Sequence, residues 1–134
     1  MEKTLAQRIE ETGITMTCER ADRNPNMTDD DWARGARHWK CVLKNGRRTL
    51  TVYFSQGCAH TQEPTVNEVL SCLCDDASQV ENASYFEEWA RDLGFDEDSR
   101  KAFKTWTICE KQAEKLSRFL GDEYDAFLNE TERE

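Results

Sequence analysis

The fold is decided by the stretch HWKCVLKNGRRTLTVYF, residues 38–54. It contains two runs rich in β-branched and aromatic residues, separated by Asn45 and Gly46, a pair that tolerates the positive φ of a tight turn. Alternation along both runs predicts a β-hairpin with one apolar face toward the core. The residues on that face are Trp39, Cys41, Leu43, Leu50, Val52 and Phe54.

The sequence before the hairpin predicts one more strand. Residues 14–18 alternate apolar residues with threonine and follow a glycine, a pattern typical of a strand. Residues 1–12 are polar apart from Leu5 and Ile9, which lie at helical spacing. This first segment therefore predicts either a short helix or a flexible arm.

After the hairpin the apolar period changes from two residues to about 3.6, which indicates helices. Thr65 and Glu68 form a capping box that begins the first of them. Further apolar stripes run over residues 86–93, 102–120 and 124–128. The whole chain of 134 residues then predicts a single α+β domain. In it, a three-stranded antiparallel sheet in residues 13–57 is followed by three to four α-helices in residues 64–130, packed on one face.

The charge of the chain is unevenly distributed. There are 27 Asp and Glu against 18 Lys and Arg, a net charge of −9, but residues 1–67 carry +1 and residues 68–134 carry −10. This balance disfavours a surface that wraps phosphate backbones and favours a basic partner. The candidate partner-binding residues are the carboxylates of residues 75–98: Asp75, Asp76, Glu87, Glu88, Asp92, Asp96, Glu97 and Asp98. Some of them also suit helix N-termini, a structural use of the same charge.

A second candidate surface is basic and lies at the hairpin. Its residues are Trp32, Arg37, Lys44, Arg47 and Arg48. Such a patch could contact nucleic acid or an acidic protein, with Trp32 as an exposed anchor. The alternative is that these cations are solvated charges that protect the sheet edges from aggregation.

A third candidate is a zinc or thiol site, because Cys58, His60, Cys72 and Cys74 are zinc-ligand types. Their C-x-H and C-x-C spacings are tighter than the usual two to four intervening residues, and two residues separated by one other point about 200° apart on a helix. A nucleophilic Cys58 would need His60 or His38 as its base.

The sequence lacks the common motifs of enzymes and of membrane proteins. No nucleophile elbow, phosphate loop or metalloprotease helix is present, and no apolar run approaches the roughly 18 residues that cross a bilayer. We therefore expect a protein without enzymatic activity, metal or cofactor. We also expect it to be soluble and cytosolic, with its six cysteines as reduced thiols.

A set of short runs carries a family resemblance over residues 13–132. They are MTCER (16–20), NPNM (24–27), HWKC (38–41), YFSQG (53–57), EPT (63–65), VENA (80–83), FEEW (86–89), DSRKA (98–102) and RFLG (118–121). In these runs the chain resembles a family of small accessory proteins of bacteriophages, prophages and other mobile elements.

The resemblance implies a protein that acts in the cytoplasm of a bacterial host. Small acidic proteins of this origin include inhibitors of host defence, such as anti-CRISPR proteins, some of which use clustered carboxylates to occupy nucleic-acid channels. The expected partner is thus a bacterial defence protein or ribonucleoprotein with a basic surface, such as a Cas protein.

Overall fold

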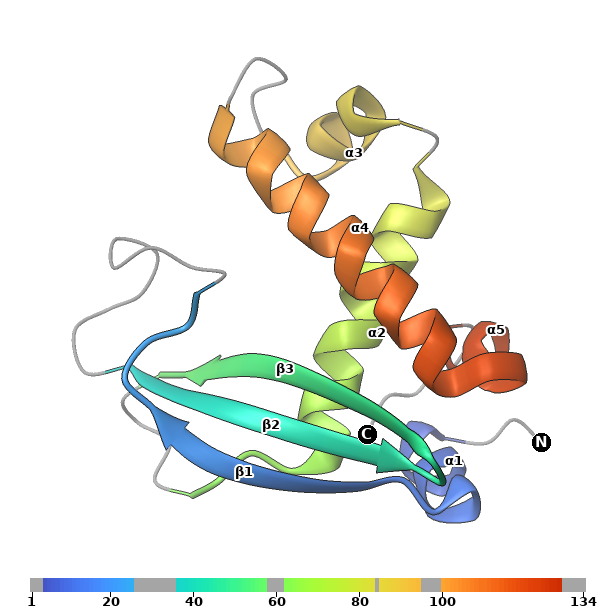
Figure 1. Ribbon diagram of the computed structural model, residues 1–134. Helices are drawn as coiled ribbons and strands as arrows, with labels where there is room; N and C mark the ends of the chain where they lie inside the picture. The colour runs from blue at the N-terminus through green and yellow to red at the C-terminus, as the bar shows by residue number, and fades with distance from the viewer. Residues whose placement is uncertain (1–3, 26–35, 58–61, 84, 95–99, 129–134) are drawn as a thin grey trace.

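The computed structural model describes residues 4–25, 36–57, 62–83, 85–94 and 100–128, and it has the predicted α+β fold (Figure 1). The elements are α1 (Leu5–Thr12), β1 (Thr15–Ala21), β2 (Arg37–Asn45), β3 (Arg48–Gln56), α2 (Val66–Asn82), α3 (Phe86–Asp92), α4 (Arg100–Leu120), the 3-10 turn η2 (Gly121–Glu123) and α5 (Tyr124–Leu128). Three antiparallel strands form one sheet in the order β1-β2-β3, so the three-stranded sheet is confirmed.

The hairpin turn lies one residue later than its Asn45-Gly46 signal indicates. Asn45 pairs with Arg48 in the sheet, so Gly46 and Arg47 are the two residues of the turn. Gly46 has a φ of 61°, whereas no described residue other than glycine has a positive φ. Glycine at the first turn position is typical of a type II′ hairpin. The amide of Asn45 instead donates to the carbonyl of Phe119 at 3.0 Å, which ties the hairpin end to α4.

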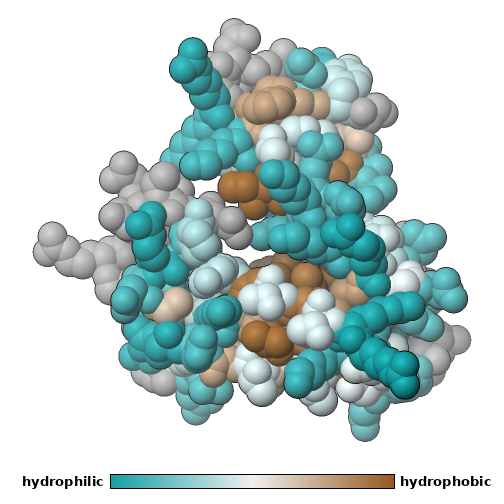
Figure 2. Space-filling model, viewed as in Figure 1, coloured by the Kyte–Doolittle hydropathy of each residue, from teal (hydrophilic) through white to brown (hydrophobic). Residues whose placement is uncertain are grey.

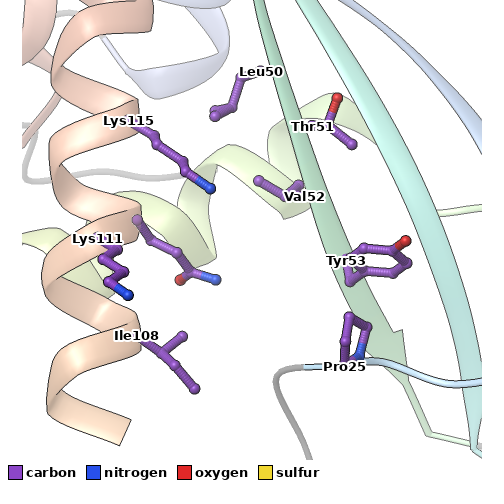
Figure 3. Close-up of a pocket in the computed structure, with 9 residues that line it drawn as sticks. Pro25, Leu50, Thr51, Val52, Tyr53, Ile108, Lys111 and Lys115 are labelled. Atoms are coloured by element: carbon purple, nitrogen blue, oxygen red, sulfur yellow. The ribbon is translucent and has the colours of Figure 1, made fainter. Parts of the chain in front are cut away.

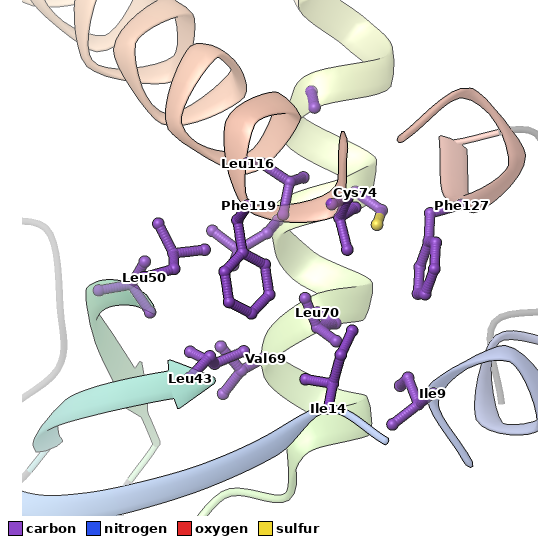
Figure 4. Close-up of a cluster of buried hydrophobic side chains, with 14 of the residues drawn as sticks. Ile9, Ile14, Leu43, Leu50, Val69, Leu70, Cys74, Leu116, Phe119 and Phe127 are labelled. Atoms are coloured by element: carbon purple, nitrogen blue, oxygen red, sulfur yellow. The ribbon is translucent and has the colours of Figure 1, made fainter. Parts of the chain in front are cut away.

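The core lies between one face of the sheet and the helices. Leu43 and Leu50 are paired across the hairpin and pack with Val69 of α2, Phe119 of α4 and Phe127 of α5 (Figure 4). Burying each such side chain contributes about 1.5–3 kcal/mol. The other face of the sheet carries exposed threonines at positions 15, 17, 49 and 51. The predicted alternation of the strands is therefore confirmed.

The N-terminal segment is a helix from Leu5 to Thr12, the first of the two structures that its sequence predicts. Its N-cap is Thr4, whose hydroxyl accepts from the Gln7 amide while the Gln7 side chain accepts from the Thr4 amide. Leu5 and Ile9 enter the core, with exposed fractions of 0% and 7%. A flexible arm is thus not what residues 5–12 form, because two of their side chains are needed in the core.

A second, smaller hydrophobic cluster holds α3 at the end of the helical part that is remote from the sheet (Figure 1). Trp89 of α3 packs on Trp106 of α4, with ring centroids 5.4 Å apart. Phe86 joins them, and Phe103 packs edge-on against Phe86 at 5.1 Å. Phe103 itself remains 54% exposed. The aromatic residues of this cluster hold α3 in place.

Candidate protein-binding surface

The predicted acidic residues fall into two groups on α2 and α3. Residues 66–93 contain seven carboxylates and a single cation, Arg91. We define the acidic surface as Asp75, Asp76, Glu87, Glu88 and Asp92. The other three predicted contacts, Asp96, Glu97 and Asp98, lie outside the described residues.

The α2 group follows one exposed stripe of the helix. Glu68, Cys72, Asp75, Asp76 and Gln79 recur at three- and four-residue spacing, which places them on one side of α2. All except Glu68 are exposed. The stripe presents three carboxylates with a thiol between them.

Asp76 occupies a distinctive position at the seam between α2 and α4. Partial desolvation, and secondarily the charge of Asp75, raise its pKa from an ordinary 3.8 to about 6. Its charge in turn acts on Cys109 of α4, whose pKa rises to about 12 mainly because the thiol is buried. One side of Asp76 therefore meets solvent and the other meets α4, and its charge changes close to neutral pH.

The α3 group is exposed and is only sparsely countered. Glu87 and Asp92 are exposed and Glu88 is half-buried. The guanidinium of Arg91 donates to the Tyr85 hydroxyl at 3.2 Å and to the backbone carbonyl of Glu87 at 3.4 Å. Within the described chain, Asp76, Glu87 and Asp92 form no ion pair with a lysine or arginine. These three charges are available to an external cation.

The helix α4 departs from the acidity of the C-terminal half. It carries six Lys and Arg against Glu110 and Glu114, a net charge of +4. It packs between α2 and the edge strand β3. The −10 of residues 68–134 is therefore not one uniform surface, because the basic α4 packs against both the acidic α2 and the strand β3.

The predicted basic patch at the hairpin is not a single patch. The strand register places Arg37 opposite Gln56, at the far end of the hairpin from the Asn45–Arg48 pair. Seven residues of strand, about 23 Å, separate Arg37 from Lys44. Arg48 lies against Gly121, where an added Cβ would collide with its guanidinium. Only Lys44 and Arg47 remain beside the turn as an outward pair, and Trp32 lies outside the described residues.

The cysteines on α2 face opposite ways. Cys74 is completely buried in the core, whereas Cys72 is exposed. The pKa of Cys72 is raised, first by partial desolvation and then by Asp76, Asp75 and Glu68, which disfavours the thiolate that binds metal. Within the described residues no three His, Cys, Asp or Glu side chains are grouped to hold a metal ion. Cys58 and His60 lie outside those residues.

Two side-chain pairs in the sheet were not expected from the sequence. Cys18 and Cys41 face each other across β1 and β2 with their sulfurs 3.3 Å apart, a juxtaposition that only the strand register reveals. His38 Nδ1 lies 2.7 Å from the Ser55 hydroxyl, which also accepts from the Asn24 amide at 3.0 Å. The bonded partner of His38 is thus a serine on β3, and this network holds the segment after β1 against the sheet.

No protein-family model, curated protein or solved structure matches the chain. Among the described residues, no helix is both long enough and apolar enough to span a bilayer. The longest, α4, carries eight charged side chains.

Proposed function

We propose that the protein is an acidic binding protein of a bacteriophage or related mobile element that inhibits a nucleic-acid-targeting defence complex in the cytoplasm of a bacterial host. The target is a protein or ribonucleoprotein with a basic groove, as in CRISPR–Cas effectors. The observation that carries this proposal is the acidic surface, whose five residues belong to a stretch, residues 66–93, with seven carboxylates and one cation. The resemblance of the sequence to accessory proteins of mobile elements supports the proposed origin in such an element and the proposed site of action in a bacterial host.

The mechanism follows from charge complementarity. Carboxylates held on α2 and α3 present negative charges to lysines and arginines that otherwise hold a phosphate backbone. Long-range attraction raises the association rate, and the docked protein excludes nucleic acid from the groove. Asp76, Glu87 and Asp92 form no ion pair with any described lysine or arginine, so no such pair must be broken before they bind. The protein acts as a competitor and performs no chemical step.

Charge reversal on α3 tests this proposal. The variant Glu87→Lys/Asp92→Lys changes the charge by +4 at two exposed sites on the acidic surface. The control variant Glu10→Lys/Asp22→Lys makes the same change at two exposed sites on α1 and after β1. The wild-type protein and both variants are immobilised and exposed to a lysate of bacteria that carry defence systems. Captured complexes are then tested for binding of duplex DNA.

The expected result separates the two variants. Wild-type protein and the control variant capture a nucleic-acid-binding complex and prevent it from binding DNA, while the α3 variant loses at least about tenfold in capture. Circular dichroism spectra check that all three proteins are folded. Undiminished capture and inhibition by the α3 variant would refute a role for these carboxylates.

A further inference from the structure

The edge of the sheet next to α4 is open. The strand order β1-β2-β3 makes β3 an edge strand, and no other strand in the described chain pairs with its outer side. Its outward backbone N–H and C=O groups are a template for one more strand. The segment Leu50–Tyr53 presents this edge to a groove beneath α4 (Figure 3).

The groove consists of two adjoining cavities of about 300 and 390 Å³. Both are lined by Leu50, Thr51 and Lys115, which makes them continuous along the strand. Ile108 of α4 lies at one end and Phe119 at the other. In the space-filling view, apolar surface is visible in the hollow between the helical part and the sheet (Figure 2). An apolar floor beside free backbone groups suits an extended peptide.

The end of the groove is held in place by hydrogen bonds. Pro25 lines it next to Tyr53. The preceding residue, Asn24, is only 6% exposed and donates to Ser55 on β3, which is also bonded to His38. This network fixes Pro25 beside the edge strand. The groove is thus bounded by ordered contacts on the strand side as well as by α4.

The charged residues that line the groove in the described part of the chain are all positive. Four cations line the two cavities, Arg48, Lys111, Lys115 and Arg118, and no described carboxylate lines either of them. Glu114 pairs with Arg118 at 3.3 Å along α4 but does not line the groove. Figure 3 shows the side chain of Lys115 extending from α4 toward β3, while that of Lys111 runs along the helix at the border of the groove. In a protein of net charge −9, this concentration of cations identifies an acidic ligand.

The spacing of the lysines matches the repeat of a strand. Lys111 and Lys115 are one helical turn apart, a rise of about 6 Å. Alternate residues of an extended chain, which share one face, are about 6.6 Å apart. Two acidic side chains at positions i and i+2 of a strand added to β3 would therefore reach one lysine each.

We propose that the groove between β3 and α4 binds an extended acidic segment of a partner protein, which adds to the sheet as a fourth strand. The backbone of the segment pairs with the edge of Leu50–Tyr53, and its alternate acidic side chains meet Lys111 and Lys115. A single-stranded nucleic acid fits less well, because the described residues that line the groove supply only two aromatic rings, Tyr53 and the buried Phe119, on which bases could stack. The open strand edge instead offers backbone groups that a peptide can pair with. This site differs in place and in charge from the acidic surface, so it does not rest on the proposed function.

The test uses a fluorescein-labelled decapeptide of alternating glutamate and valine, in low salt, with the full-length protein. The variant Lys111→Glu/Lys115→Glu reverses both groove lysines. The control Arg100→Glu/Lys104→Glu makes the same charge change at the same spacing on α4, outside the groove. Fluorescence anisotropy gives the affinity, and amide hydrogen exchange reports on the edge of β3.

We expect the acidic peptide to bind wild-type and control proteins, to lose at least about tenfold in affinity for the groove variant, and to slow amide exchange at Leu50–Tyr53. A decapeptide of alternating lysine and valine should not bind. Equal weakening in both double variants, or no binding of the acidic peptide, would overturn the proposal. If a decathymidylate probe binds the wild-type protein more tightly than the acidic peptide does, and the groove variant loses that binding, the groove is a nucleic-acid site instead. A wild-type dimer that the groove variant dissociates would assign it to a second copy of the chain.

Discussion

Asp76 is the residue whose chemistry the fold changes most clearly. Its pKa is raised to about 6, so the folded protein binds a proton on this carboxyl more tightly than the unfolded chain, for which the ordinary value is 3.8. Ionisation of Asp76 therefore costs stability, a cost that is absent below about pH 4 and complete above about pH 6. The side chain keeps contact with solvent, so screening limits this cost to less than about 1 kcal/mol.

The variant Asp76→Asn tests whether ionisation of Asp76 lowers the stability of the folded protein. It should raise the free energy of unfolding at pH 7 by a few tenths of a kcal/mol up to about 1 kcal/mol, and change it little at pH 4, where the native carboxyl is already neutral. Urea unfolding at the two pH values measures both. Asp22→Asn makes the same substitution at an exposed site after β1 and is the control. A gain of equal size at pH 4 and pH 7 would contradict the assignment.

The thiols illustrate the limit of residue-scale inference from sequence. Composition indicates six free cysteines, and the structure describes five of them as free. The pKa of Cys41 is raised to about 12, mainly because the thiol is buried and additionally because it contacts Cys18. The sequence could not indicate this pairing, because it depends on which residue of β1 opposes which residue of β2.

At the scale of elements, α2 begins at a cap that can be tested alone. The Thr65 hydroxyl accepts from the Glu68 amide at 3.1 Å, and the Glu68 carboxylate accepts from the Thr65 amide at 3.2 Å. Thr65→Ala removes the first of these bonds and should lower the free energy of unfolding by about 1 kcal/mol. Urea unfolding at pH 7 gives the value.

Thr107→Ala is the matched control for the cap. Thr107 lies within α4, where its hydroxyl bonds back to the Phe103 carbonyl at 3.0 Å without satisfying an otherwise unpaired helix end. Alanine has the higher helix propensity, so this variant should be neutral or slightly stabilising. If both substitutions destabilise the protein equally, the capping box at α2 is not what stabilises its N-terminus.

Local signals predicted most elements but not their assembly. The capping box of α2 is confirmed, as are the period-two pattern of the strands and the apolar stripe of α4 apart from Phe103. The S-x-x-E pattern of residues 84–87 predicts an N-cap at Ser84, which lies outside the described residues, but the N-cap of α3 is Tyr85, which forms no side-chain capping bond. The groove could not be predicted, because β3 and α4 lie more than 40 residues apart in the sequence. The −10 of the second half also concealed a basic helix, because a charge summed over residues 68–134 averages the +4 of residues 100–120 with the acidic segments around it.

At the scale of the whole molecule, one hydrophobic cluster stabilises the sheet and a different cluster holds α3, which carries part of the acidic surface. Phe127 and Leu43 belong to the main core, whereas Trp89 and Trp106 form the cluster that holds α3. A helix of seven residues is unstable alone, so α3 depends on this packing. Loss of the small cluster should release α3 and its carboxylates while the sheet remains folded.

Trp89→Ala in the small cluster and Phe127→Ala in the main core test whether the two clusters stabilise different parts of the molecule. Removing either buried ring destabilises the packing around it by about 3–5 kcal/mol. For Trp89→Ala we expect faster amide exchange in α3 and the N-terminal part of α4, with β2 and β3 still protected. For Phe127→Ala the loss of protection should reach the sheet. Because α3 carries Glu87 and Asp92, Trp89→Ala should also weaken capture of the basic partner although neither carboxylate is altered. Uniform loss of protection across the chain in both variants would mean that the two clusters unfold as one cooperative unit.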